Sequence, residues 1–166
     1  MDLIILKKGN AMEIFELKEK DGISDNVKLN RLYHQFQKIL TELRKIELPE
    51  KIVELINLKI EELNSISYTD KKLKKLIKKN QTKIIQLLEK ELKIVPKGYY
   101  QTLWLALGMS IFGVPIGTAI ALTIMNNMAL LGIGFPFGMI IGMCLGKQMD
   151  KKAFKEGRQL DVEIKY

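Results

Sequence analysis

The chain has 166 residues, with 27 Lys and Arg against 19 Asp and Glu, one His and one Cys, and its formal net charge is +8. A single His excludes His-based catalytic triads and His-rich metal clusters, and a single Cys excludes disulfides and thiolate zinc sites within one chain. Nine of the 12 glycines lie in the uncharged run 98–146 and the other three are isolated, so a glycine-rich phosphate loop is excluded as well. The sequence therefore predicts neither an enzyme nor a bound cofactor or metal.

The first 22 residues hold two short apolar runs on either side of Lys8-Gly9-Asn10, and this pattern is compatible with a β-hairpin. Met1–Lys8 has an acid at position 2 and only Leu3–Leu6 as an apolar core, whereas a secretory signal needs an apolar core of 7–15 residues. We therefore expect residues 1–97 to remain in the cytosol.

Three amphipathic helices are predicted next, over Ser24–Glu47, from Pro49 to about Ser65–Ser67, and over Asp70–Ile94 with Thr69 as its cap. The apolar positions that recur at helical spacing in the three helices are Leu29, Leu32, Tyr33, Phe36, Ile39, Leu40 and Leu43; Ile52, Leu55, Ile56, Ile60 and Leu63; and Leu73, Ile77, Ile84, Leu87, Leu88 and Leu92. The single His, His34, is expected to border the core of the first helix. A domain this small gains stability by packing against copies of itself, so the sequence favours an oligomer.

The third helix carries a run of lysines with no acid between Asp70 and Glu89: Lys71, Lys72, Lys74, Lys75, Lys78, Lys79 and Lys83. Lysines at this density repel one another, which favours binding of a multivalent anion such as a nucleic-acid backbone or anionic lipid; the alternative is a solvated helix face. If the helix stands upright on the membrane, the lysines lie beyond the roughly 8 Å Debye length, which favours an oligonucleotide. Tyr33 and Tyr68 are candidates to stack on bases, or else ordinary core residues.

Residues 98–146 form a run of 49 residues without a charged side chain or His, about twice the length that crosses a bilayer as a helix. We predict two transmembrane helices, Leu103–Met125 and Met128–Gly146, joined by a turn at Asn126-Asn127. Lys93 and Lys97 precede the spans, and more basic residues follow them, so both termini are predicted to be cytoplasmic.

Each span contains the motif G-x-P-x-G, as Gly113-Val-Pro115-Ile-Gly117 and as Gly134-Phe-Pro136-Phe-Gly138, and the second span continues with Gly142 and Gly146. The two copies run in opposite directions, so the repeat is inverted across the membrane and places both prolines at one depth, as a hinge. Stripes of small residues mark contact faces between membrane helices. One stripe is explained by packing within the hairpin alone, whereas two stripes favour a ring of hairpins around a pore.

The residues predicted to line such a pore are Ser110, Phe112, Thr118, Thr123, Phe135 and Phe137. Beyond Gly146 a helical continuation is expected, followed by apolar residues at every second position from Leu160 to Tyr166. This alternation predicts a C-terminal strand, with the N-terminal segment as its partner. The predicted organisation is a cytosolic helical ligand-binding domain (1–97), a transmembrane hairpin (98–147) and a cytosolic tail (148–166).

The membrane half resembles the small glycine-zipper hairpin proteins of bacteria, through the two G-x-P-x-G motifs, Lys151-Lys152-Ala153 and the exit sequence Gly157–Leu160. The order of domains is similar to that of membrane effectors of bacterial anti-phage systems, and in particular to the Hailong effector family. That resemblance implies a bacterial inner-membrane channel topped by a crown that binds a single-stranded DNA signal and holds the channel shut, toxic on opening, with Lys71–Lys83 as the DNA site.

We therefore expect a mainly α-helical, homo-oligomeric membrane channel gated by a polyanionic ligand, with itself, the lipid bilayer and single-stranded DNA or another oligonucleotide as partners. The alternative is a non-conducting membrane anchor or scaffold that recruits a protein partner through its cytosolic helices. A holin-like lytic protein fits less well, because lysis does not need a cytosolic domain of this size.

Overall fold

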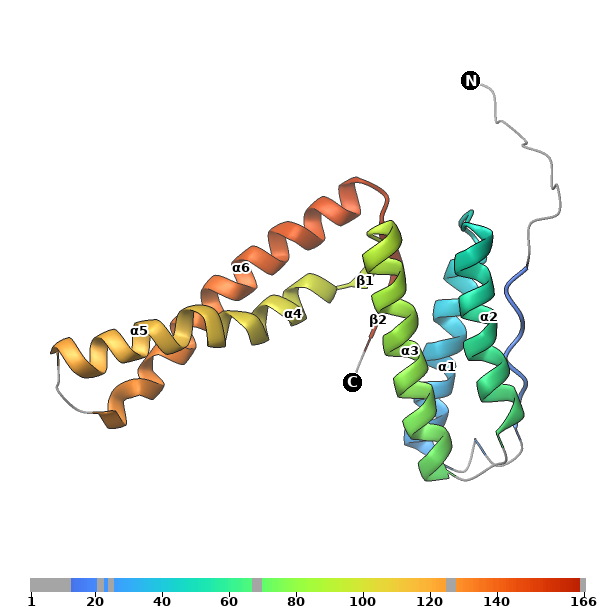
Figure 1. Cartoon of the computed structure of the whole chain (residues 1–166), viewed down its shortest axis with the longest axis horizontal. Coiled ribbons are helices and arrows are strands. Elements are labelled where there is room, and N and C mark those ends of the chain that lie inside the picture. The colour runs from blue at the N-terminus through green and yellow to red at the C-terminus, as the bar shows by residue number, and fades with distance from the viewer. Residues whose placement is uncertain (1–12, 21–22, 24–25, 67–69, 125–127, 165–166) are drawn as a thin grey trace, which may run out of the picture. The chain divides into compact units, whose positions relative to one another are not determined.

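The computed structural model describes the chain apart from residues 1–12, 21–22, 24–25, 67–69, 125–127 and 165–166 (Figure 1). The chain divides into two compact units, Met1–Leu92 and Lys93–Tyr166. The first unit contains three helices, and the second contains two long apolar helices closed by a pair of short strands.

The helices of the first unit are α1 (Val27–Leu43), α2 (Glu50–Ser65) and α3 (Asp70–Leu92), and α3 packs against both of the others. The three predicted helices are thus confirmed, with shorter ends. The N–H of Leu29 donates to the Asn26 side chain 3.2 Å away, which caps the start of α1. Pro49 caps α2 instead of lying in its first turn, and its carbonyl accepts from the N–H of Ile52 at 2.9 Å. The predicted cap Thr69 lies outside the described residues.

The core of the first unit follows the predicted stripes closely but not completely. All seven predicted positions of α1 are buried. In α2 the prediction for Leu55 is wrong: its side chain is 36% exposed, while Val53 and Asn57 are buried instead. In α3 Leu87 and Leu92 are only half-buried, and Ile85 takes a core position. The shifts in α2 arise because this helix is covered on a second side, by the segment described next.

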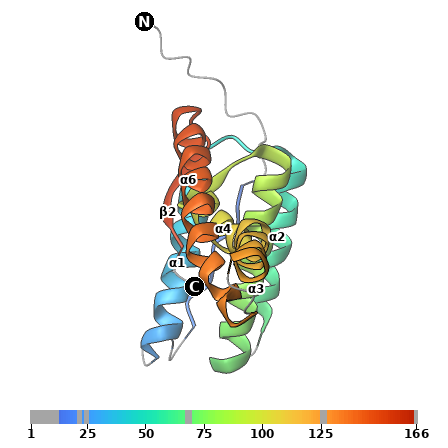
Figure 2. The same ribbon diagram turned by 90° about the vertical axis from the view of Figure 1, so that its left-hand side faces the viewer.

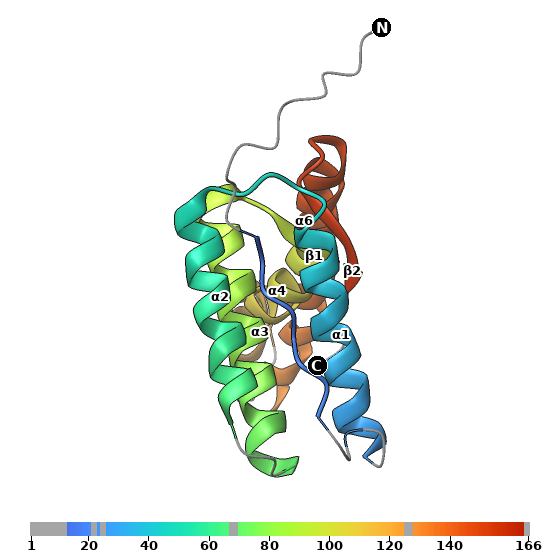
Figure 3. The ribbon, with the colours of Figure 1, turned by 90° about the vertical axis from the view of Figure 1, so that its right-hand side faces the viewer.

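Residues 13–20, here called the N-terminal strap, run in an extended form between α1 and α2 (Figure 3). The Asn57 amide accepts from the N–H of Phe15 at 2.8 Å and donates to the carbonyl of Glu13 at 3.0 Å. Asn64, two helical turns later, binds the strap in the same way, accepting from the N–H of Lys18 at 2.9 Å and donating to the carbonyl of Glu16 at 3.0 Å. Side-chain amides therefore take the place of a neighbouring strand. The described strap forms no hairpin, and the expected turn at Lys8-Gly9-Asn10 lies outside the described residues.

The second unit contains two long helices that run side by side (Figures 1 and 2). The first consists of α4 (Tyr99–Gly108), the π-helical turn η2 (Met109–Gly113), α5 (Val114–Ala119) and the π-helical turn η3 (Ile120–Ile124). The second begins as the 3-10 helix η4 (Met128–Ile133) and continues as α6 (Gly134–Lys155). Helices Tyr99–Thr123 and Leu131–Lys155 are long and apolar enough to cross a membrane. The predicted Asn126-Asn127 turn lies outside the described residues.

Two short strands close the open end of this hairpin. β1 (Val95–Lys97) pairs in parallel with β2 (Gln159–Glu163), with Val95 opposite Gln159 and Pro96 opposite Leu160. The predicted C-terminal strand is confirmed; among the described residues it pairs with β1, while most of the partner that we predicted, the N-terminal segment, lies outside the described residues. Gly157 has a φ of +68°, a left-handed conformation in which the chain leaves α6 and turns back beside β1.

The substitution Asn57→Ala tests how the strap is held. It leaves the N–H of Phe15 and the carbonyl of Glu13 without their partner, at a cost of about 1–3 kcal/mol. We expect faster amide hydrogen exchange over residues 13–20 of the full-length protein and a lower melting temperature. Asn64→Ala is the matched control, with a smaller effect because its hydrogen bonds are exposed. Unchanged exchange in Asn57→Ala would mean that the apolar anchors Ile14 and Leu17 hold the strap alone.

Candidate functional site

The lysines of α3 form a continuous basic surface on the solvent side of the helix. The buried residues of α3, among them Leu73, Ile77, Ile84 and Leu88, lie on the opposite side. Six of the seven predicted lysines are exposed, and we call them the lysine face: Lys71, Lys72, Lys75, Lys78, Lys79 and Lys83. Lys74 is half-buried at the edge of the core, about 100° around the helix from Leu73.

No lysine of this face forms an ion pair within the described residues. Glu62 of the neighbouring helix α2 is engaged elsewhere, because it lies 3.5 Å from Lys59 and accepts from the Asn80 amide at 3.2 Å. Exposed like charges one helical turn apart repel each other, and an anion that bridges them relieves this repulsion. The arrangement suits a ligand with several phosphates along its length.

The aromatic and histidine side chains of this unit do not supplement the lysine face. Tyr33 is 3% exposed, and its hydroxyl donates to the carbonyl of Lys18 at 2.6 Å, so it is a core residue that cannot stack on a base. Burial, together with the nearby Glu19, raises the pKa of Tyr33 to about 12. Tyr68 lies outside the described residues. His34 is exposed beside Gln37, and its ring lies edge-on to that of the core residue Tyr33, with ring centroids 6.3 Å apart.

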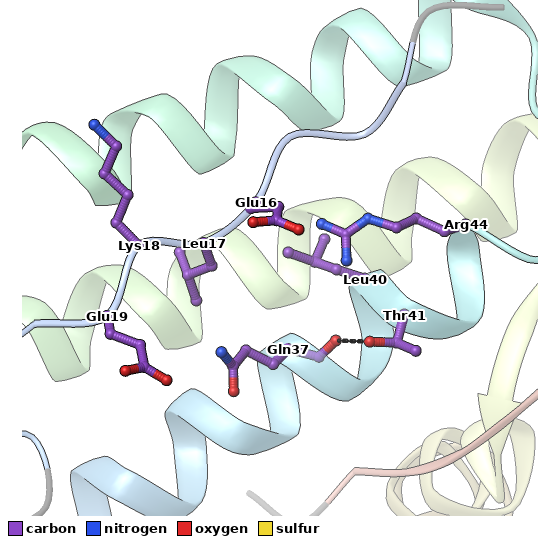
Figure 4. Close-up of a pocket in the computed structure, with 8 residues that line it drawn as sticks. All are labelled: Glu16, Leu17, Lys18, Glu19, Gln37, Leu40, Thr41 and Arg44. Carbon is purple, nitrogen blue, oxygen red and sulfur yellow. Dashed lines mark hydrogen bonds between the residues drawn. The ribbon is translucent and has the colours of Figure 1, made fainter.

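A surface groove of about 550 Å³ lies between the strap and α1 (Figure 4). It is lined by Glu16, Leu17, Lys18, Glu19, Gln37, Leu40, Thr41 and Arg44. The Arg44 guanidinium donates to the carbonyls of Ile14 at 3.3 Å and Phe15 at 2.7 Å, so this cation holds the strap. Among the described residues no group of three or more His, Cys, Asp and Glu side chains is placed to hold a metal ion.

In the second unit the two long helices touch backbone to backbone. A Cβ atom on Gly138 would lie 2.7 Å from the Cα of Gly113, and one on Gly134 would lie 2.7 Å from the Cα of Gly117. A Cβ on Gly146 would lie 2.5 Å from the Cα of Gln101. Such separations are too short for any side chain. We call this contact the glycine seam, formed by Gly108, Gly113 and Gly117 on the first helix and by Gly134, Gly138, Gly142 and Gly146 on the second.

The seam changes the interpretation of the glycine stripes. Both stripes face each other within one chain, so a single contact uses all six predicted glycines. The inference that two stripes exceed what one hairpin needs is therefore wrong, and the alternative, packing within the hairpin alone, accounts for both. Any contact between copies has to use another surface.

Gly108 belongs to the seam but was not among the predicted packing residues. It lies five residues before Gly113, which a stripe of spacing four does not include. In the π-helical turn Met109–Gly113 the Val114 N–H donates to the Met109 carbonyl, five residues earlier, so the turn contains one residue more than an α-helical turn. This extra residue places Gly108 on the same side of the helix as Gly113. The five-residue gap just before Pro115 is the sequence signal for this turn.

The two prolines occupy the first turns of α-helical segments. Pro115 is the second residue of α5, and Pro136 is the third of α6. Both segments continue a preceding helical turn, since the Val114 N–H of α5 donates to the Met109 carbonyl, so each proline lies inside a longer helix and removes one backbone donor there. Gly134 lies against Gly113 and Gly117, which flank Pro115, so the two motifs lie at the same level of the hairpin.

The predicted pore residues do not share one face. Phe135 and Phe137 are two residues apart in α6, or about 200° around the helix. One ring carbon of Phe135 lies 3.3 Å from the position of a Cβ on Gly113 while the residue is 38% exposed, whereas Phe137 is 52% exposed. The hydroxyl of Thr118 donates to its own helix at the Val114 carbonyl, at 2.8 Å, and Thr123 does the same at Ala119. Ser110 is exposed and Phe112 half-buried, both in the π-helical turn.

Asp150 of α6 caps the other helix of the hairpin. Its carboxylate accepts from the N–H groups of Tyr100 at 3.1 Å and Gln101 at 3.0 Å, in the first turn of α4. Gly98, at the cap position of α4, has no side chain for this role. The sequence analysis missed Asp150. Its signal is its position four residues after Gly146, on the seam side, as a lone acid among lysines.

The strands and their neighbours form a clasp at the same end. Val95, Tyr100 and Ala153 make a small buried cluster, against which Tyr99 and Trp104 pack. Lys97 pairs with Asp161, and Arg158 donates to the carbonyl of Lys93 and to Glu156. The hydrogen bond from Arg158 lowers the pKa of the Glu156 carboxyl. The clasp thus fixes the chain entering the first long helix to the chain leaving the second.

The substitution Gly138→Leu tests the seam. A side chain here meets the backbone of Gly113, which cannot move without separating the helices, so we expect a loss of about 3 kcal/mol or more. The melting temperature of the full-length protein in detergent should fall sharply. Ile140→Leu is the matched control, because Ile140 is 61% exposed on the outer side of the same helix. An equal effect of both substitutions would argue against a close backbone contact at Gly138.

Comparisons with known proteins identify no relative of this chain. No family model, curated protein or solved structure matches the chain. The similarity to glycine-zipper hairpins and to the Hailong effector family thus consists of motif and domain order alone.

Proposed function

We propose that the second unit is a multi-pass hairpin in the bacterial inner membrane, with both termini in the cytoplasm. The apolar windows of its helices have mean hydropathies of 1.9 and 1.2, and only 22% of each window is buried. The remaining apolar side chains point outward, where lipid would cover them. The basic residues Lys93, Lys97, Lys147 and Lys151 lie at one end of the pair, which supports this end as the cytoplasmic one.

We further propose that copies of the chain form a channel gated by a polyanionic ligand, single-stranded nucleic acid, on the lysine face. The observation that carries this proposal is the row of six exposed lysines without an ion pair among the described residues. A ring of copies would multiply this positive potential. The ligand gates the channel only if it binds the open and closed states with different affinity. By analogy with the Hailong family, the channel would act as an anti-phage effector.

A single hairpin encloses no lumen, so conduction requires several copies in contact through their outer faces. These faces carry large exposed side chains, among them Ile111, Leu122, Phe137 and Ile140. No charged residue or His lies between Gly98 and Gly146, so a pore between such faces would be weakly selective.

The second candidate function is a non-conducting membrane anchor that recruits a partner protein. The glycine seam favours it, because all six glycines of the predicted packing stripes are used in contacts within one hairpin. The first unit also has an apolar surface groove of about 210 Å³ lined by Leu55, Leu58, Lys59, Lys83, Ile84 and Leu87. Measuring ion flux distinguishes the channel, which conducts ions, from the anchor, which does not.

Charge reversal tests the lysine face. We expect Lys71→Glu, Lys75→Glu, Lys78→Glu and Lys79→Glu together to weaken binding of a single-stranded DNA oligonucleotide at least tenfold in a gel-shift assay. The wild-type protein should also lose affinity steeply with salt, with a log–log slope of about −3 to −4 if four to six phosphates are contacted.

The matched control reverses four exposed lysines outside α3, Lys28, Lys38, Lys45 and Lys51, for the same change of net charge. If both quadruple variants lose affinity equally, the oligonucleotide responds to net charge and does not bind at the lysine face in particular. Flux through proteoliposomes of the full-length protein, with the oligonucleotide supplied or removed by nuclease, then tests gating. Flux that depends on the oligonucleotide supports the channel, and no flux under either condition supports the anchor.

A further inference from the structure

The outer side of α6 carries a second basic row, separate from the lysine face. Lys147, Lys151 and Lys155 follow at spacing four, so they lie along one side of the helix, and all three are exposed. Gly146, Asp150 and Ala153 are buried toward the other long helix. The row therefore points away from the hairpin, where the apolar span ends.

The acids of this stretch do not neutralise the row. Asp150 lies between Lys147 and Lys151 in the sequence, but its carboxylate turns inward and caps α4. Glu156 accepts from Arg158 at 2.8 Å and lies 4.0 Å from Lys152, a lysine outside the row. Within the described residues, Lys147, Lys151 and Lys155 form no ion pair.

The direction of α6 turns these side chains toward the apolar span. Side chains on a helix lean toward its N-terminus, and the N-terminal part of α6 is the apolar part. At about 1.5 Å per residue, Lys151 lies roughly 6 Å beyond Lys147, and Lys155 roughly 12 Å beyond it. The headgroup layer is roughly 5–8 Å thick, so Lys147 and Lys151 reach it directly and Lys155 reaches its rim. Phe154 is 69% exposed on the same side, as an interfacial aromatic residue would be.

We propose that Lys147, Lys151, Lys155 and Phe154 form a binding site for the headgroups of anionic phospholipids. The site rests on the membrane insertion proposed above, and is independent of channel activity and of nucleic-acid binding. Lysines close to a membrane surface each favour anionic over zwitterionic lipid by about fivefold. We therefore expect a preference of at least tenfold.

The experiment measures lipid binding to the full-length protein in detergent by native mass spectrometry, with phosphatidylglycerol and phosphatidylcholine of identical acyl chains. The wild type should bind phosphatidylglycerol at least tenfold more tightly, and Lys147→Gln, Lys151→Gln and Lys155→Gln together should reduce the preference to less than twofold. The control, Lys28→Gln, Lys38→Gln and Lys51→Gln, should keep it. Soluble glycerol phosphate at the same concentration should not compete.

Three results would overturn the proposal: no lipid preference in the wild type, a full preference in the α6 triple variant, or equal competition by glycerol phosphate, which would indicate a site for free anions. Extraction of membranes with alkaline carbonate shows whether the protein is inserted in the bilayer. It therefore distinguishes a failure of the lipid-site proposal from a failure of the proposed membrane insertion. A protein that resists extraction yet shows no lipid preference contradicts this site alone, whereas release from the membrane contradicts insertion as well.

Discussion

The close approach of two helix backbones at the glycine seam is the constraint on which the second unit depends. It requires glycine on at least one helix at each of these contacts, and it requires the π-helical turn Met109–Gly113, because that turn brings Gly108 and Gly113 to the same side. Several Cα groups point at carbonyl oxygens of the facing helix, as between Gly138 and Gly108, a geometry typical of weak C–H···O bonds. Asp150 and the parallel strands then fix the open end of the hairpin.

This constraint also determines which surfaces remain for function. Because the glycines face each other, the outer sides carry the large apolar residues, and contacts with lipid or with other copies have to use them. Because Asp150 turns inward, the lysine row of α6 has no ion pair among the described residues and stays exposed on the outer side of that helix. In the first unit, α3 likewise has an apolar side in the core and a basic side outside it. The lysine face of α3 is therefore accessible to an anionic ligand.

Much of the fold was predictable because it depends on local periodicity. The three helices, the complete buried stripe of α1 and the exposure of most lysines in α3 follow from spacing alone. What was missed depends on contacts between distant residues. Asn57 is buried because it binds the strap, and Val95 lies beside Gln159 because Gly157 turns the chain back. Asp150 caps α4 by accepting from the N–H of Tyr100, 50 residues earlier in the sequence. The role of the glycines was misjudged because sequence spacing shows a contact face but not whether the partner helix is in the same chain.

The most direct test of this account places spin labels at Leu107 and Ile141, next to Gly108 and Gly142 of the seam, in a full-length protein with Cys144→Ser. Dipolar broadening is measured in lipid bilayers with and without an excess of unlabelled protein. An intrachain seam predicts strong broadening that dilution leaves unchanged and that Gly138→Leu abolishes. Broadening that disappears on dilution would show that the glycines pack between copies, and would contradict the account.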